Sequence, residues 1–294
     1  MIFYEEAAMK LRLLPGFLLF IAAVSISAHG AKPKSKWAKL DSYKIHYYDT
    51  GNTQLKDALV LIHGWACNAE FWKDSYNEFP NYRTITIDLP GHGRSDKPKL
   101  VYSIDHFARS VHAVLKQAGV RNVVLAGHSM GTAVARQFYR RYPKQTLGIV
   151  VVDGPLRQLA PKAEMDKFLA SMRSNYTESS AKFVDGMMPA VKDKALAKFI
   201  RDNMLATPEH VGLSSREGMA DERIWANDKI DVPVLAVMAP PTWNWQREVK
   251  ETYMDLAPML EFHQWTGVSH FLMMERPGEF NDLVNAFIVK NRLL

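Results

Sequence analysis

The feature that most constrains this chain is the stretch VVLAGHSMG at residues 123–131. Its leading apolar residues suit a buried strand, and an alanine-rich segment compatible with a helix follows at 132–142. A serine in so sharp a strand-to-helix turn has strained backbone geometry, and glycines two residues to either side leave room for the neighbouring strand and helix. We therefore predict that the Ser129 hydroxyl stands clear of the sheet. The same turn aims the Met130 amide at the place where an oxyanion would form.

Three other motifs lie at the ends of predicted strands. The apolar run 58–62 ends at HGW, and the strand at 83–87 is followed by DLPGHGRSD. Between them, residues 68–80 are predicted to form a helix with Phe71, Trp72 and Phe79 as its apolar residues. The run DLPGHGRSD has the glycines and short polar side chains of a turn, so we interpret its His92 as structural. A last strand at 260–265 precedes TGVSH, which ends at His270, and then an amphipathic helix. Because strands alternate with helices, we predict a doubly wound, mostly parallel sheet with catalytic groups at the carboxyl ends of its strands.

Together these four motifs resemble the α/β-hydrolase family, in its serine hydrolase and esterase branch with a helical cap. The resemblance implies that Ser129 is the nucleophile and that His270 is the general base. It also implies that the main-chain amides of Trp65 and Met130 form the oxyanion hole. Imidazole suits the role of base because its unperturbed pKa of roughly 6.5 lets it take a proton and return it near neutral pH. Serine at the turn argues against the dehalogenase and epoxide hydrolase branches, which use aspartate there.

The sequence departs from the family pattern at the acid of the catalytic triad. The family usually places this acid after the strand that corresponds to residues 232–238, but the loop 239–246 contains no carboxylate. Asp153 ends a neighbouring predicted strand, and some family members take the acid from that position. We therefore predict Asp153 as the acid. Glu248 is the alternative, and a weakened serine–histidine dyad is the third possibility.

Between residues 156 and 228 the alternation of strands and helices stops. The segment is rich in helix formers and has no clear strand, and the resemblance implies an inserted helical cap at this point. We predict that the cap covers the active site with adaptable apolar side chains, with a plain helical decoration as the alternative. The hydrolase core then comprises residues 37–155 and 229–294. The methionines of the insertion are Met165, Met172, Met187, Met188, Met204 and Met219.

Residues 1–28 are predicted to be a signal peptide that directs export to the periplasm or out of the cell. Two basic residues precede an apolar run at 13–26, which is short for a bilayer span, and small residues follow up to a predicted cleavage site after Ala28. Because the acidic opening fits a signal poorly, Met9 would make a better start than Met1. An uncleaved membrane anchor is the alternative.

Composition limits the remaining function classes. With 294 residues, of which 47% are hydrophobic, the chain can bury a sizeable core as one large domain with an insertion or as two modest ones. Its net charge of +6 comes from scattered bases, which we interpret as solvated surface rather than a nucleic-acid site. The single cysteine, Cys67, cannot form an internal disulfide.

The resemblance implies acyl transfer to water, without a metal or an organic cofactor. The expected substrate is an ester of a small or medium apolar acid, with walls supplied by the cap and by Trp243 and Trp245. A lactone, a thioester or a carbon–carbon bond next to a ketone is an alternative on the same triad. A binding protein with impaired catalysis is the alternative from another class. The mature chain is expected to have no nucleic-acid partner and no stable membrane insertion.

Overall fold

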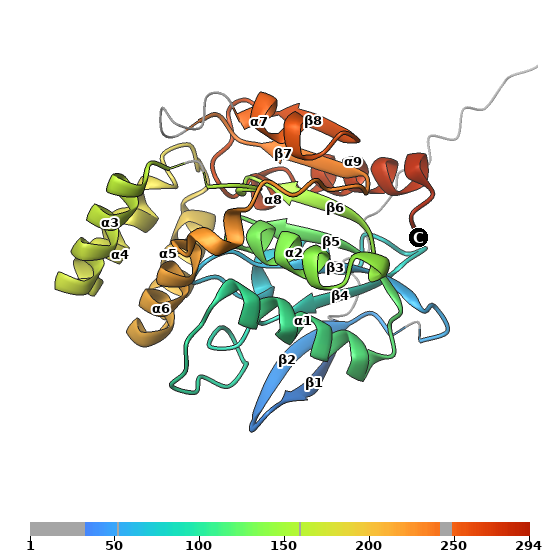
Figure 1. Cartoon of the computed structure of the whole chain (residues 1–294), viewed down its shortest axis with the longest axis horizontal. Coiled ribbons are helices and arrows are strands. Elements are labelled where there is room, and N and C mark those ends of the chain that lie inside the picture. The colour runs from blue at the N-terminus through green and yellow to red at the C-terminus, as the bar shows by residue number, and fades with distance from the viewer. Residues whose placement is uncertain (1–32, 52, 159, 242–248) are drawn as a thin grey trace, which may run out of the picture. The chain divides into compact units, whose positions relative to one another are not determined.

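The computed structural model describes residues 33–51, 53–158, 160–241 and 249–294. The predicted signal peptide and the predicted roles of Trp243, Trp245 and Glu248 lie outside the described residues. Figure 1 shows an eight-stranded sheet in the order β1-β2-β4-β3-β5-β6-β7-β8. Its strands are β1 (Lys34–Leu40), β2 (Tyr43–Asp49), β3 (Asp57–Ile62), β4 (Arg83–Ile87), β5 (Asn122–His128), β6 (Thr146–Val152), β7 (Val234–Met238) and β8 (Leu260–Gln264).

The sheet is parallel over most of its width. β1 and β2 form an antiparallel hairpin, β2 pairs antiparallel with β4, and every pairing from β4 to β8 is parallel. Nearly all residues of β3, β5, β6 and β7 are buried, as expected for strands with helices on both faces. The predicted doubly wound, mostly parallel sheet is therefore confirmed.

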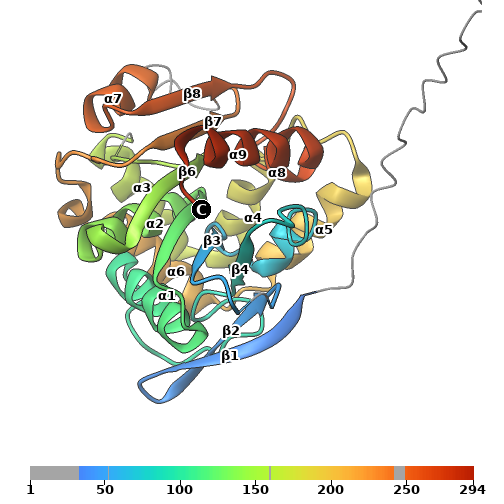
Figure 2. The same ribbon diagram turned by 90° about the vertical axis from the view of Figure 1, so that its right-hand side faces the viewer.

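Helices cover both faces of the sheet. Figure 2 shows α1 (Ile104–Ala118), α2 (Met130–Arg141) and α7 (Val249–Leu256) on one side and the pair α8 (Leu272–Glu275) and α9 (Pro277–Asn291) on the other. α1 has the expected ends: the Ser103 hydroxyl accepts a hydrogen bond from the His106 amide, and Gly119 closes the helix with a φ of 69°.

One predicted helix is wrong. The apolar pattern at 68–80 indicated a helix, but only a 3-10 turn, η1 (Ala69–Trp72), forms there, and turns follow it. Phe71 packs against Phe271, whereas Trp72 packs against Phe280 in α9. The Asp74 carbonyl accepts a hydrogen bond from the Asn281 side chain. The Asp74 carbonyl, which in a continuous helix would accept a main-chain hydrogen bond, is thus bound by a side chain of α9 instead.

Four helices lie between β6 and β7 in the chain: α3 (Lys162–Ser174), α4 (Tyr176–Gly186), α5 (Lys194–Leu205) and α6 (Glu209–Met219). We call them the cap helices. Figure 1 shows them beside the carboxyl ends of the parallel strands. Two further 3-10 turns are η2 (Pro143–Gln145) and η3 (Glu222–Trp225). Within the described ranges, no helix has both the length and the hydropathy needed to cross a bilayer.

Candidate active site

The turn between β5 and α2 has the strained geometry predicted for it. Ser129 has φ 53° and ψ −119°, outside the regions that non-glycine residues favour. A Cβ atom on Gly127 would collide with the main chain of Gly131, and one on Gly131 would collide with the carbonyl of Ile62. The Ser129 hydroxyl does not cap α2. The turn therefore presents a hydroxyl that its own helix does not use.

The two predicted oxyanion donors come from adjacent strand ends. β3 and β5 pair in parallel up to Ile62 and Gly127, and these two strands lie where the strand order reverses direction, the usual position of ligand sites in such sheets. Met130 is the first residue of α2, so its amide has no acceptor one turn earlier in the helix. Among the described residues the Trp65 amide donates to no other main-chain group. Both amides are thus available for a ligand.

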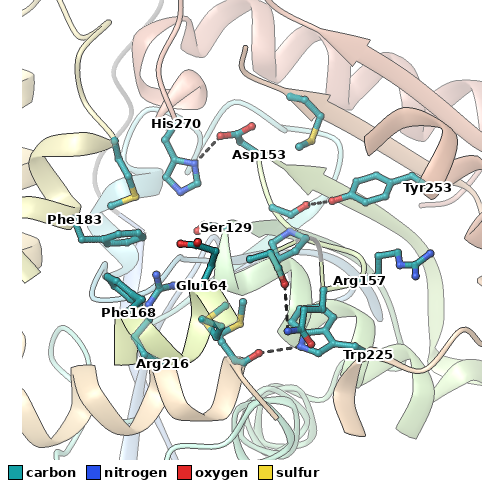
Figure 3. Close-up of a pocket in the computed structure, with 18 residues that line it drawn as sticks. Ser129, Asp153, Arg157, Glu164, Phe168, Phe183, Arg216, Trp225, Tyr253 and His270 are labelled. Carbon is teal, nitrogen blue, oxygen red and sulfur yellow. Dashed lines mark hydrogen bonds and ion pairs between the residues drawn. The ribbon is translucent and has the colours of Figure 1, made fainter. Parts of the chain in front are cut away.

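The structure brings the predicted acid and base together. Asp153 follows β6, and His270 follows β8, with the end of β7 between them. Asp153 Oδ1 accepts a hydrogen bond from the Ala239 amide at 2.9 Å, and Asp153 Oδ2 accepts one from His270 Nδ1 at 2.6 Å. Figure 3 shows this contact with Ser129 below it. An acid that follows β6 therefore reaches the histidine past the end of β7. This bond orients the imidazole, and none of the described residues makes a hydrogen bond with its Nε2, the nitrogen needed for proton transfer.

His128 supports the same histidine from its other side. Its Nε2 donates to the His270 carbonyl at 2.9 Å, and the two rings lie 4.7 Å apart between centroids. Burial lowers the pKa of His128 well below its usual value, as does the neighbouring His270, so His128 is neutral near pH 7. Ser269 adds a second anchor, because its amide and hydroxyl both donate to Glu275 Oε1.

A cavity of about 280 Å³ opens over Ser129 and His270. Its floor is formed by the ends of the sheet strands, and its walls are formed largely by the cap helices and the segments that flank them. Three of the six predicted methionines line it, Met165, Met187 and Met219, together with Phe168 and Phe183. Of the other three, Met172 is wholly buried, Met204 is nearly so, and Met188 is partly buried against the core. A methionine-rich apolar wall was predicted from the sequence.

Arg216 and His128 are among the polar residues of the site that were not predicted from the sequence. Arg216, on α6, lines the cavity, and nothing in the sequence distinguished it from the other charged residues of the insertion, since Glu217 follows it directly. His128 stands next to Ser129 in the elbow motif, but nothing in the sequence indicated that it would bind the main chain of His270. Both depend on contacts between segments far apart in the chain.

His92 lies in a buried structural network, as interpreted from its turn motif. Its Nδ1 donates to the Pro90 carbonyl, and its ring lies 5.0 Å from that of His63. Burial, followed by repulsion from His63, lowers the pKa of His92 to about 3. Asp88 in the same turn accepts hydrogen bonds from the Ala69 and Arg94 amides. In the part of the chain that the structure describes, no cluster of three or more His, Cys, Asp or Glu side chains could hold a metal ion.

Comparison with known proteins agrees with this fold. A family model described as the alpha/beta hydrolase fold matches residues 57–203. One relative, from Paraburkholderia phymatum, is named 2-hydroxy-6-oxononadienedioate/2-hydroxy-6-oxononatrienedioate hydrolase. It is 27% identical over 270 residues, which is 83% of this chain and 91% of the relative.

Two solved structures share the fold. One, titled Est816 as an N-acyl homoserine lactone degrading enzyme, has a TM-score of 0.74 and 24% identity, and the match covers 86% of this chain and all of that one. The other, an esterase from Exiguobacterium antarcticum, has a TM-score of 0.76 and 18% identity, covering 87% and 99%. At these identities the likeness concerns the fold alone.

Proposed function

The chain belongs to the alpha/beta hydrolase fold family, and we propose that it is a serine hydrolase that cleaves an ester-type bond of a small or medium apolar substrate. The observation that carries this proposal is the 2.6 Å contact between His270 Nδ1 and Asp153 Oδ2 at a cavity that Ser129 also lines. Nucleophile, base and orienting acid are the three roles that acyl transfer needs.

In the proposed mechanism Ser129 Oγ attacks the carbonyl carbon while His270 Nε2 takes the hydroxyl proton. Asp153 holds the imidazole and stabilises the imidazolium. The amides of Trp65 and Met130 donate to the oxyanion of the tetrahedral intermediate. The imidazolium returns its proton to the leaving alcohol, which leaves an acyl-serine. Water, deprotonated by the same histidine, then releases the acid and restores the serine.

A second candidate is hydrolysis of a carbon–carbon bond next to a ketone. This candidate is supported by the relative from Paraburkholderia phymatum, whose name gives an oxo acid as its substrate. The similarity to that relative covers 83% of this chain. The same serine and oxyanion donors could act on a ketone carbonyl. Lactone and thioester hydrolysis need no further groups either.

Covalent labelling tests the proposal directly. A fluorophosphonate probe should label the purified wild-type protein, and the label should disappear in Ser129→Ala. A screen of p-nitrophenyl esters by acyl length, with lactones, thioesters and a vinylogous 1,5-diketo acid alongside, then identifies the bond that is cleaved fastest. A correctly folded protein without any label would favour the alternative of a binding protein that has lost catalysis.

A further inference from the structure

The cavity over Ser129 contains an arginine that the proposed reaction does not use. Arg216 projects from α6 and lines the cavity together with Ser129 and His270. In the view of Figure 3, Arg216 lies on the other side of Ser129 from Asp153 and His270, beside Phe168. It is therefore placed to contact a part of the substrate away from the bond that is cleaved.

Aromatic rings surround the guanidinium of Arg216. Its central carbon lies 4.3 Å from the ring centre of Phe183, 4.8 Å from that of Phe168 and 5.2 Å from that of Trp65. The ring of Phe183 in turn packs edge-on against Trp65 and in a tilted arrangement against Phe168. These faces favour a cation, but they cannot satisfy the five N–H donors of a guanidinium.

No protein acceptor fills that need. Within the described ranges Arg216 makes no hydrogen bond or ion pair, and its Nε is buried without a partner. The adjacent carboxylate, Glu217, faces outward and binds Arg173 instead. Buried charges in proteins are normally paired, so the missing partner points to a ligand.

None of the other charged side chains that line the cavity pairs with Arg216. Asp153 is engaged by His270. Glu164 and Arg157 also line the cavity, and neither forms an ion pair with Arg216. Burial lowers the pKa of Arg216 to about 10, which is far enough above neutrality for the side chain to remain cationic. An anionic group on the substrate would therefore meet a permanent positive charge.

We propose that Arg216 binds a carboxylate of the substrate, so that the substrate class is an ester with an apolar body and a free carboxylate at a distance from the cleaved bond. A planar carboxylate can accept two N–H bonds from a guanidinium, and the methionine and phenylalanine side chains enclose the apolar part. This inference rests on the proposed function, because it takes Ser129 as the nucleophile.

Matched substrates test the inference. The acid series consists of mono-p-nitrophenyl esters of linear dicarboxylic acids with five to eight carbons, and the neutral series carries a methyl group in place of the free carboxylate. For the best chain length, wild-type kcat/KM should favour the acid ester by at least about tenfold. Arg216→Met should reduce the ratio of acid to neutral kcat/KM by about 100-fold, mainly through KM, as expected for loss of a charge-assisted pair. Arg216→Lys should retain part of the ratio.

Two controls separate this role from a structural one. Arg173→Met removes an exposed cap arginine and should leave the ratio unchanged, whereas Arg157→Met removes the other cationic side chain of the cavity. A wild type without preference for acid esters, equal losses on both series in Arg216→Met, or loss of the preference in Arg157→Met alone would overturn the inference.

A binding measurement keeps the inference separate from the proposed reaction. Titration calorimetry of adipate against Ser129→Ala should show binding that weakens by about tenfold or more in Ser129→Ala/Arg216→Met. Equal affinities in the two proteins would contradict a carboxylate site at Arg216, even if fluorophosphonate labels the wild type. Absence of labelling with normal adipate binding would instead refute the proposed reaction.

Discussion

The ends of the sheet strands and the cap helices form one cavity, but they contribute to it in different ways. At the strand ends the main chain determines the positions: Ser129 and Asp153 both have positive φ, and the flanking glycines cannot accept a side chain. The cap supplies long side chains instead, and among them the buried Nε of Arg216 has no partner in the described part of the chain. Under the proposed function, the strand ends would carry the chemistry and the cap would determine which molecule reaches it.

The largest effect on activity should follow from removing the proposed nucleophile, Ser129. Ser129→Ala should lower kcat by about 10⁶-fold, since loss of a nucleophile leaves only the oxyanion hole and substrate binding. The loss should be the same for acid and neutral esters, as measured by steady-state kinetics with a burst-titrated wild-type standard. Substantial residual turnover would place the nucleophile elsewhere and break the division between strand ends and cap.

Replacement of the acid should have the next largest effect. Asp153→Asn keeps the shape but favours the wrong imidazole tautomer, so kcat should fall by about 10⁴-fold. Glu248→Gln is the matched control and should change kcat little. Near-normal turnover in Asp153→Asn together with a large loss in Glu248→Gln would move the acid to the loop after β7.

Matched ion pairs compare the stability of the two regions. Asp49 and Arg83 form a buried pair at 2.8 Å in the sheet, whereas Asp185 and Arg201 form an exposed pair in the cap. Asp49→Asn should lower the free energy of unfolding by about 3–5 kcal/mol, because it leaves a buried guanidinium without its carboxylate. Asp185→Asn should cost less than about 1 kcal/mol. Urea titration of both variants measures the contrast, and similar losses would refute it.

The same sheet pair also predicts a direction of pH dependence. Burial opposes ionisation of Asp49, but the hydrogen bonds from Arg83 and Lys36 outweigh it and lower the pKa to about 2. A lowered folded-state pKa stabilises the fold above the unfolded value of about 4, and this contribution is lost as the pH falls through about 2. Asp49→Asn should therefore flatten the acid limb of the stability curve.

The smallest expected effects on stability come from two glycines, one in the elbow turn and one in the cap helices. Gly131→Ala would press a methyl group onto the carbonyl of Ile62 and should destabilise the protein by about 1–3 kcal/mol. Gly186→Ala, at the end of α4, meets nothing within 4 Å and should stabilise by about 0.4–1 kcal/mol. If both substitutions lowered the midpoint temperature of thermal unfolding, the cap would be as closely packed at Gly186 as the elbow turn is at Gly131.

The sheet was predictable because its strands carry local signals. Runs such as ALVLI and VVLAG are buried on both faces, so their apolar character is visible without knowledge of their neighbours. The elbow turn was equally visible, because its glycines are required by close main-chain approach. The helix expected at 68–80 failed for the opposite reason, since contacts with α9 decide its conformation.

The site was predictable only where a residue belongs to a local motif. Ser129 and His270 lie at strand ends that the sequence marks, and the structure places them at one cavity. The contact of Asp153 with His270 depends on how far β6 and β8 are separated in the sheet, which no local pattern encodes. Arg216 was missed because the aromatic rings around its guanidinium belong to Trp65, Phe168 and Phe183, which lie far from it in the sequence.

The signal peptide stays a prediction that mass spectrometry of the mature terminus would test.

Trp65 joins the two regions through a single residue. Its indole Nε1 donates to the Gly212 carbonyl of α6 at 2.8 Å, and its ring faces Arg216, while its own main chain follows β3. A change in the position of α6 would therefore disturb the side chain of Trp65, the residue whose amide is a proposed oxyanion donor. Substitutions in α6 and at position 65 should therefore covary among relatives. Transfer of this cap to another hydrolase core should require transfer of the tryptophan with it.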